Sequence, residues 1–397
     1  MKAKSFLSKT LLNVTPSMHK VRRLSLFAAV ESAINGGSLS VTGLGRNIDN
    51  KAQEKHRIKR VDRLCNNMNI HREINTIYQH MSTLLVSPYT TPKISVDWSD
   101  NDERKQHFIL RASLATQGRS LTLYEEVHPL SRKEKPVIHR QFMERLKTML
   151  PASCTPIIIT DAGFRIPWFQ LIISLGWDYI GRVRNATHCK RKCDDIWFPV
   201  KSLYEKATRK SKDLGIYQQG RKQLFESRLV IVKRKPKGRK DKIAAGEKSR
   251  MSRLSRASAA RESEPWLLAT SLKSTKGMAK KVRRNYATRM QIEESFRDVK
   301  TGLNMNAGDT RMINRLSVLF LIALLAQYLL FVLVLAVKEA GKHRQYQANS
   351  IKTRNVLSNQ FIGLRAYKDK QLRLLKKHWL GAIEALKQLI IAPQSCC

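Results

Sequence analysis

The hydrophobic pattern of this chain changes near residue 93, and this change restricts the possible folds more than any other feature. Three segments rich in β-forming residues come first, at 93–98, 106–116 and 120–127, and a Gln-Gly-Arg turn joins the last two. A helix, a strand, a helix and a strand follow, at 136–150, 156–160, 167–175 and 179–184. Three antiparallel strands followed by alternating helices and strands predict a mixed sheet with helices on its faces.

This order of elements is that of an RNase H-like α/β core. The order lapses at about 185–275, where short strands and a basic stretch at 233–261 predict a β-rich insertion with a loop suited to contact phosphates. We therefore expect an all-helical N-terminal domain at 1–90, the α/β core at 91–316 and a C-terminal helical region at 317–397.

The charge of the chain indicates its partner. Lys and Arg number 74 against 31 Asp and Glu, which gives a formal net charge of +43 at pH 7. A compact fold with this charge repels itself unless a polyanion binds to it, so we expect a nucleic acid as the partner. The positive residues occur in every segment, which favours an extended binding surface over a single basic tail.

The first ninety residues are predicted to form helices, among them 21–34, 40–48 and 51–65. Tight turns join these helices, and the last one is basic, as in a helix-turn-helix domain that binds double-stranded DNA. We take three of its side chains as candidate DNA contacts: Lys55, Arg57 and Arg60. A plain helical bundle with a solvated basic face is the alternative.

Six cysteines are scattered along the chain, and its first residues lack the apolar core and cleavage site of a signal peptide. We therefore expect a reducing, cytoplasmic location. The segment His188–Cys193 has the residue types of a zinc site. A second ligand pair does not follow at the usual spacing, so we expect no zinc there.

An apolar run, Ser317–Val337, is long enough to span a bilayer and has cationic residues at both ends. Gln327 and Tyr328 interrupt its middle, and nothing in the basic remainder of the chain requires an anchor. We expect a helix that is buried on all sides within the protein, and a membrane helix is the alternative.

A continuous helix is expected from Tyr286 to Lys300. At about 100° per residue it places four side chains on one stripe: Tyr286, Arg289, Glu293 and Lys300. This combination suits phosphodiester chemistry, because the acid can bind Mg²⁺ while the cations neutralise phosphate oxygens. Without further support, such a stripe indicates an ordinary salt-bridged helix surface.

Two aspartates provide that support, because each one comes at the end of an apolar strand. Asp97 follows Ile94–Val96, and Asp161 comes just after Ile157–Ile159. A buried carboxylate needs a partner. In an RNase H-like sheet these two strands are neighbours, and a cation between the carboxylates relieves their repulsion. The sequence therefore predicts a divalent-metal site made by Asp97, Asp161 and Glu293.

Five segments resemble those of one enzyme family, at 96–100, 110–113, 160–164, 264–270 and 292–298. The last of them lies within the pattern Tyr-x2-Arg-x3-Glu-x6-Lys, which is matched at all four positions. With the two aspartates in order, the chain resembles the DDE transposases of bacterial insertion sequences. Within them it is similar to the group of the tetracycline-resistance composite transposon, from about residue 19 to about residue 370.

The resemblance implies roles for the candidate residues. Asp97, Asp161 and Glu293 would be the catalytic ligands of two Mg²⁺ ions, for which Mn²⁺ can substitute. Three residues would contact phosphates at the cleaved DNA end: Tyr286, Arg289 and Lys300.

Two tryptophans also belong to the resembling segments. Trp266 is similar to the tryptophan that stacks on a base flipped from the duplex, where an indole face compensates about 1–3 kcal/mol of lost stacking. A core aromatic that opens a strand is the alternative interpretation of Trp266. Trp98 and Asp100 are expected to frame the site, and Asp100 is the rival candidate for the role of Asp97.

The implied reaction is cut-and-paste DNA transposition, in which transposon ends are cleaved through a hairpin intermediate and their 3′-OH ends are joined to target DNA by two-metal phosphoryl transfer. The resemblance also implies a homodimer that holds two DNA ends, with the C-terminal helices at about 357–391 in contact. Two other interpretations remain, a non-catalytic sequence-specific DNA-binding regulator and a simple RNase H-like nuclease.

Overall fold

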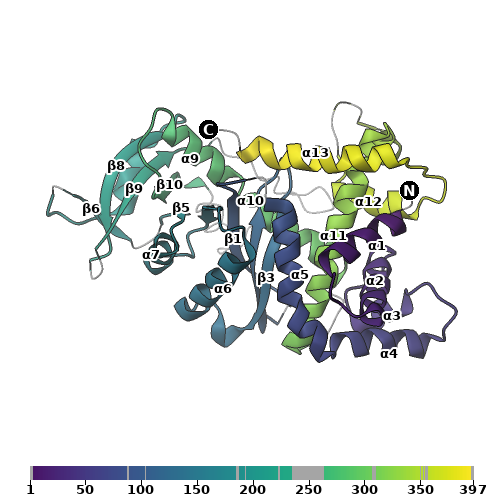
Figure 1. Cartoon of the computed structure of the whole chain (residues 1–397). Coiled ribbons are helices and arrows are strands. Elements are labelled where there is room, and N and C mark those ends of the chain that lie inside the picture. Colours follow the sequence, from purple (N-terminus) through teal and green to yellow (C-terminus); the bar gives the residue numbers. More distant parts are fainter. Residues whose placement is uncertain are drawn as a thin grey trace, which may run out of the picture. The chain divides into compact units, whose positions relative to one another are not determined.

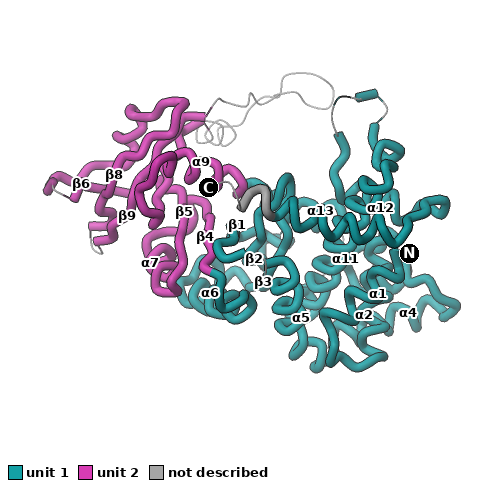
Figure 2. The backbone as a smooth tube through the Cα atoms, turned by 45° about the horizontal axis from the view of Figure 1, so that its top comes forward, with its two compact units in different colours: residues 1–154, 290–396 teal, residues 155–289, 397 magenta. Residues whose placement is uncertain are grey.

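The computed structural model describes residues 3–86, 89–102, 104–184, 187–192, 194–221, 224–234, 263–305, 310–348, 350–351, 353 and 356–394. Two compact units make up the chain, and they are coloured separately in Figure 2. Unit 1 consists of Met1–Cys154 and Met290–Cys396, and unit 2 contains Thr155–Arg289. Helices and strands carry the labels of Figure 1.

Unit 1 begins with five helices: α1 (Ala3–Val14), α2 (Lys20–Ile34), α3 (Val41–Arg46), α4 (Glu54–Cys65) and α5 (Met68–Val86). The all-helical start that the sequence predicts is therefore confirmed. The Ser40 side chain caps α3 by accepting a hydrogen bond from the Gly43 amide at 3.0 Å. Helix α3 packs closely on α4 because Gly45 has no side chain, and a Cβ there would lie 2.4 Å from the Ile58 Cα.

Three antiparallel strands of unit 1 follow: β1 (Lys93–Asp100), β2 (His107–Leu114) and β3 (Leu121–Pro129). They lie where the sequence predicts them, and helix α6 (Pro136–Met149) comes next. In the strand register Asp97 is directly opposite Arg111, and Arg111 is directly opposite Glu125. Directly opposite residues extend from the same face of a sheet. These three side chains therefore share one face.

The remaining helices of unit 1 are α10 (Met290–Arg297), α11 (Ile313–Glu339), α12 (Asn359–Lys368) and α13 (Lys376–Gln394). Helix α11 is long and apolar enough to cross a membrane, yet 94% of its most apolar stretch is buried inside the structure. It packs against α2, α12, α13 and β3 (Figure 1). Within the described residues α11 is thus the central core helix of unit 1.

In unit 2, β4 (Ile157–Thr160) pairs in parallel with β5 (Asp178–Arg182), and α7 (Ile166–Ser174) connects them. Five more strands extend this sheet from β5 in antiparallel fashion: β10 (Trp266–Thr270), β9 (Phe225–Val232), β8 (Lys212–Gln219), β6 (His188–Arg191) and β7 (Phe198–Pro199). The β-rich insertion is therefore present. Most of the predicted basic loop, residues 235–261, lies outside the described residues.

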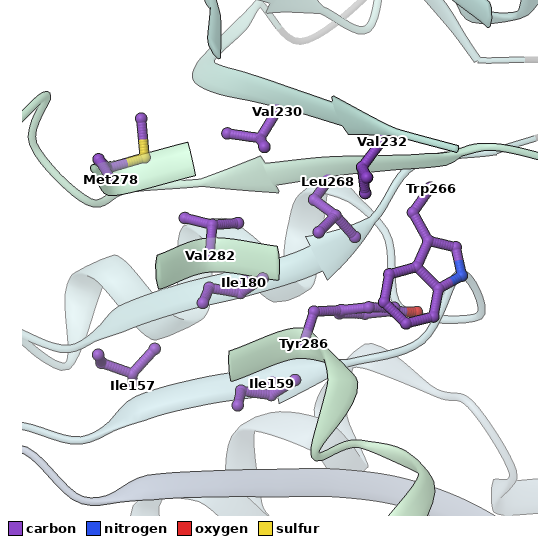
Figure 3. Close-up of a cluster of buried hydrophobic side chains, with 10 residues drawn as sticks. All are labelled: Ile157, Ile159, Ile180, Val230, Val232, Trp266, Leu268, Met278, Val282 and Tyr286. Carbon is purple, nitrogen blue, oxygen red and sulfur yellow. The ribbon is translucent and has the colours of Figure 1, made fainter. Parts of the chain in front are cut away.

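Helix α9 (Met278–Ala287) covers one face of the unit 2 sheet. Figure 3 shows Val282 and Tyr286 of this helix among apolar side chains of β4, β5, β9 and β10. This cluster forms because Ile157 and Ile159 on β4, like Ile180 on β5, extend from the face that α9 covers.

The prediction of one continuous helix from Tyr286 to Lys300 is wrong. Helix α9 ends at Ala287 and α10 begins at Met290. The Thr288 Oγ1 donates a hydrogen bond to the Asn285 carbonyl at 2.7 Å, and the Thr288 amide bonds to the same carbonyl, three residues back instead of four. A hydroxyl that competes for a helix carbonyl favours such a break.

The break separates the four residues of the predicted stripe. Tyr286 is on α9 in unit 2, and Arg289 lies in the turn that follows it. Glu293 is on α10 in unit 1, and Lys300 lies in the π-helical turn Asp298–Gly302 after α10. One helical stripe therefore does not account for their arrangement.

Candidate functional site

Asp97 occupies a buried position on β1, where it is 8% exposed. Its Oδ1 accepts a hydrogen bond from the Trp98 amide at 2.9 Å. The register places its side chain on the sheet face from which Arg111 also extends. Asp97 and the buried Arg111 therefore share one face of the unit 1 sheet.

Arg111 is fully buried and connects this sheet face to α10. Its Nε donates to Glu125 Oε2 at 2.7 Å, and its NH2 lies 2.6 Å from the same oxygen. Its NH1 donates to the Ser295 hydroxyl at 3.0 Å, and its guanidinium lies 4.3 Å from the centre of the Phe296 ring. Helix α10 is thereby held on the face of the sheet that carries Asp97.

Further polar contacts fix α10. The Gln291 side chain donates to the Thr116 carbonyl at 2.7 Å and accepts from the Thr116 amide at 3.2 Å. Arg119 pairs with Glu294, and its Nε lies 3.1 Å from the Asp298 carboxylate. Glu294 and Asp298 are therefore structural acids that hold α10 through Arg119.

Glu293 itself is exposed on α10. Residues on either side of it are bonded to β2 and to the turn that follows β2, and these contacts set its position along the strands. Sequence reasoning missed Arg111 and Ser295 as positioning residues. The available signal was a charged residue, Arg111, in an otherwise apolar strand.

Lys300 forms an ion pair with Asp100 in unit 1, with Nζ 2.6 Å from Oδ1. This hydrogen bond lowers the pKa of Asp100 below its ordinary value of 3.8. The Asp100 carboxylate is therefore engaged by a protein cation, whereas a metal ligand needs its oxygens for the ion.

We predict that Asp100→Asn changes the rate of DNA cleavage by no more than about fivefold, the range of a partly exposed ion pair. The variant keeps the shape of the side chain and releases Lys300. Cleavage of a labelled duplex by Asp100→Asn and by Asp97→Asn measures the difference. Loss of cleavage in Asp100→Asn with retention in Asp97→Asn would make Asp100 the metal ligand instead.

Trp98 extends from the opposite face of β1, because it follows Asp97 in the strand. Its Nε1 donates to His139 Nε2 of α6 at 3.0 Å, and its ring packs edge-on against His128. Burial, with a smaller contribution from His128, lowers the pKa of His139 to about 4, so this nitrogen remains an acceptor at neutral pH. Trp98 thus anchors β1 beside Asp97.

Asp161 directly follows β4 in unit 2 and is partly buried. Its Oδ1 accepts a hydrogen bond from the Gly163 amide at 2.8 Å, and a Cβ at Gly163 would come within 3.1 Å of that oxygen. Asp161 is therefore in unit 2, whereas Asp97 and Glu293 are in unit 1. Within the described part of the chain, no three His, Cys, Asp or Glu side chains form a group that could hold a metal ion.

Trp266 and Tyr286 lie together in the apolar cluster of unit 2 (Figure 3). Their ring centres are 4.8 Å apart with an interplanar angle of 79°, and the two residues are 8% and 4% exposed. The Arg234 guanidinium lies over the indole, 4.3 Å from the ring centre. Trp266 is thus a core residue that starts β10, and its stacking on a base stays a prediction.

The three candidate contacts on α4 differ in their surroundings. Lys55 is exposed. Arg57 donates to the Ile48 carbonyl at 2.7 Å, and Arg60 donates to the Ser25 hydroxyl at 3.1 Å and to the Leu24 carbonyl at 2.8 Å. The two arginines thus join α4 to the preceding segments. Both line a groove of about 840 Å³, together with three other cationic or ionisable residues of α4: His56, Lys59 and Arg63.

Cys189, from the cysteine pair of the possible zinc motif, is buried on β6. Burial raises the pKa of its thiol to about 12, which opposes the thiolate that zinc binding needs. Cys193 lies outside the described residues.

Comparison with protein families identifies a family to which this chain is similar. The model of the family described as transposase DDE domain matches residues 87–329, more than half of the chain. The matched segment contains Asp97, Asp161 and Glu293, and its strands and helices have the RNase H-like order that the sequence predicts. None of the curated proteins gives a match.

Proposed function

This chain belongs to the transposase DDE domain family and is therefore a phosphoryl-transfer enzyme of DNA transposition, and we propose that Asp97, Asp161 and Glu293 are its catalytic residues. Members of the family bind DNA and generally use divalent metal ions. At a finer level, we propose that the enzyme is the transposase of a bacterial insertion sequence, related to the group of the tetracycline-resistance composite transposon.

One observation in unit 1 supports the proposal that Asp97 and Glu293 are catalytic residues. Arg111 lies opposite Asp97 in the strand register and donates to Ser295 of α10, two residues after Glu293. The buried aspartate and the helix that presents the exposed glutamate thus share one sheet face. Asp161 would complete the site from the end of β4.

The donor set fits magnesium. Three carboxylates supply the hard oxygen ligands that Mg²⁺ prefers, and Mn²⁺ accepts the same donors. Carboxylates that meet at one place repel each other unless a cation neutralises them. We therefore propose that Asp97, Asp161 and Glu293 hold two such ions.

The mechanism assigns a separate task to each group. Two bound ions would supply an activated water and a stabilised leaving 3′ oxygen. The Trp98 amide and the strand register orient Asp97, and the anchored helix α10 orients Glu293. Arg289, Lys300 and the Tyr286 hydroxyl would bind phosphate oxygens around the scissile bond.

We further propose cut-and-paste transposition with a hairpin intermediate, in which Trp266 stacks on a flipped base. Base access to the indole face requires displacement of the Arg234 guanidinium from it. Residues 1–90 would bind terminal inverted repeats, the core at 91–316 would perform the chemistry, and helices within 317–397 would mediate a homodimer. The location would be the bacterial cytoplasm, in association with the nucleoid.

We predict that the purified chain with Mg²⁺ nicks a duplex that carries the terminal inverted repeat flanking its coding sequence and then forms a hairpin at that end. EDTA should abolish both products and Mn²⁺ should restore them, because the carboxylates act through the bound ions. A denaturing gel resolves nicked, hairpin and joined strands.

The products of this assay distinguish a transposase from a DNA-binding regulator and from a simple nuclease. A DNA-binding regulator would retain the duplex in a mobility-shift assay without cutting it. A simple nuclease would cut the duplex but give neither hairpin nor joined strands. Either result would refute the cut-and-paste proposal.

A further inference from the structure

Unit 2 contains a cavity of about 650 Å³ that none of the roles above uses. Its lining comes from the loop and helix start after Asp161, the end of β5 with the residues that follow it, and the turn after β8, at 162–169, 182–184, 187–188 and 219–221. The first two of these segments follow the carboxyl ends of β4 and β5. In α/β sheets, ligands bind outside the carboxyl ends of parallel strands.

The cavity is strongly basic. Four arginines and a histidine line it: Arg165, Arg182, Arg184, Arg221 and His188. Arg184 donates to Glu264 at 2.8 Å, whereas the Nε of Arg182 is buried and has no hydrogen-bond partner among the residues that the structure describes. Arg165 and Arg221 are exposed and form no ion pair with any residue in the described part of the chain. An anion therefore finds donors there that the protein itself leaves available.

One wall of the cavity is apolar and firmly packed. Phe164 and Phe169 line it together with the start of α7. The Phe169 ring stacks on Tyr179 with ring centres 4.5 Å apart, and it occupies the space above Gly181, where a Cβ would lie 2.3 Å from the ring. An apolar wall beside arginines is suited to a ligand with a flat apolar part and a negative charge.

The apolar wall of this cavity is on the other face of the sheet from the Trp266 cluster. Tyr179 and Gly181 alternate along β5 with Ile180, so they extend from the opposite face of the sheet. Ile180 belongs to the cluster that contains Trp266 and Tyr286 (Figure 3). The Phe169 wall is therefore on the face away from the tryptophan.

We propose that this cavity binds an unpaired nucleotide of a DNA strand, with the base against the phenylalanine wall and the phosphate on Arg165 and Arg221. A volume of about 650 Å³ lies within the range of pockets that bind one small ligand, about 300–1,000 Å³. The inference rests on the proposed function in that the hairpin formed at the cleaved end has unpaired nucleotides at its tip. It adds to the proposed function a binding site for unpaired DNA.

The test compares two DNA probes on the full chain by fluorescence anisotropy, a labelled 20-mer of thymidine and a blunt duplex of the same length. The variant Arg165→Gln/Arg221→Gln is expected to bind the single strand about tenfold more weakly. The slope of log affinity against log salt should fall in magnitude by about 1.4, since each phosphate contact on a single strand contributes about 0.7. Duplex affinity should change by less than about twofold.

The matched control is Arg209→Gln/Lys210→Gln, which removes the same charge from exposed positions of unit 2 outside the cavity. It should leave both affinities within about twofold of the unchanged chain. An equal loss for both probes in the cavity variant, or no loss for the single strand, would overturn the inference. Asp161→Asn should not weaken single-strand binding, so cleavage that survives this substitution refutes the catalytic proposal and leaves the cavity proposal standing.

Discussion

Asp161→Asn and Glu293→Gln are each expected to lower the rate of DNA strand cleavage at least about a thousandfold, a loss of about 4 kcal/mol of transition-state stabilisation. Each substitution keeps the size of the side chain and removes a negative charge that the metal ions need. DNA affinity should stay the same or rise slightly, because a charge that repels phosphates is lost. Cleavage of a radiolabelled transposon end and a mobility-shift assay measure the two effects.

Matched controls exist in both units. Asp195 is fully exposed in unit 2, and Glu144 is exposed on α6 in unit 1. Asp195→Asn and Glu144→Gln remove the same charges from positions that the mechanism does not use, so cleavage should stay within about twofold. Cleavage that persists in Asp161→Asn or Glu293→Gln would remove that residue from the catalytic set.

The second large effect concerns the buried pair Arg111–Glu125, whose side chains are 0% and 2% exposed. Arg111→Met should lower the free energy of unfolding by about 3–5 kcal/mol, because Glu125 is then buried without a cation. The double variant Arg111→Met/Glu125→Leu should recover most of that loss, since it leaves no buried charge. Urea denaturation followed by tryptophan fluorescence measures both values.

The pH dependence of the Arg111→Met variant identifies the cause of its instability. Burial raises the pKa of Glu125 above its ordinary value of 4.5, and Arg111 opposes this shift. Without Arg111 the pKa in the folded state rises further above the unfolded value, so the variant loses stability as the pH rises through that folded pKa. The difference from the unchanged protein should therefore shrink as the pH is lowered from 8 toward 4.5. A difference that is constant over this range would attribute the loss to packing alone.

The recovered double variant also tests positioning. It lacks the Arg111 bond to Ser295, so α10 loses one anchor while the fold is restored. If Arg111 positions Glu293, cleavage should remain impaired in the stable double variant although DNA binding is normal.

Local patterns were sufficient for much of the fold. Apolar runs that end in a single acid located β1 with Asp97 and β4 with Asp161, because strand periodicity is visible within a few residues. Local patterns gave a wrong prediction for residues 286–300, where we expected one continuous helix. Helical spacing continues through Thr288, yet its hydroxyl bonds to the Asn285 carbonyl, and Tyr286 packs against Trp266 twenty residues earlier in the chain. The helical periodicity of the sequence indicates neither of these two contacts.

The amino-acid sequence alone determined the order of the elements, the excess of positive charge and the identity of the acids that we assign to catalysis. Tertiary structure alone decided that Arg111 stands opposite Asp97 and bonds to Ser295, 184 residues away, and that exposed arginines gather at a cavity in unit 2. The reason is the range of the interactions. Periodicity depends on neighbours along the chain, whereas ion pairs, anchors and cavities arise only when distant segments pack together.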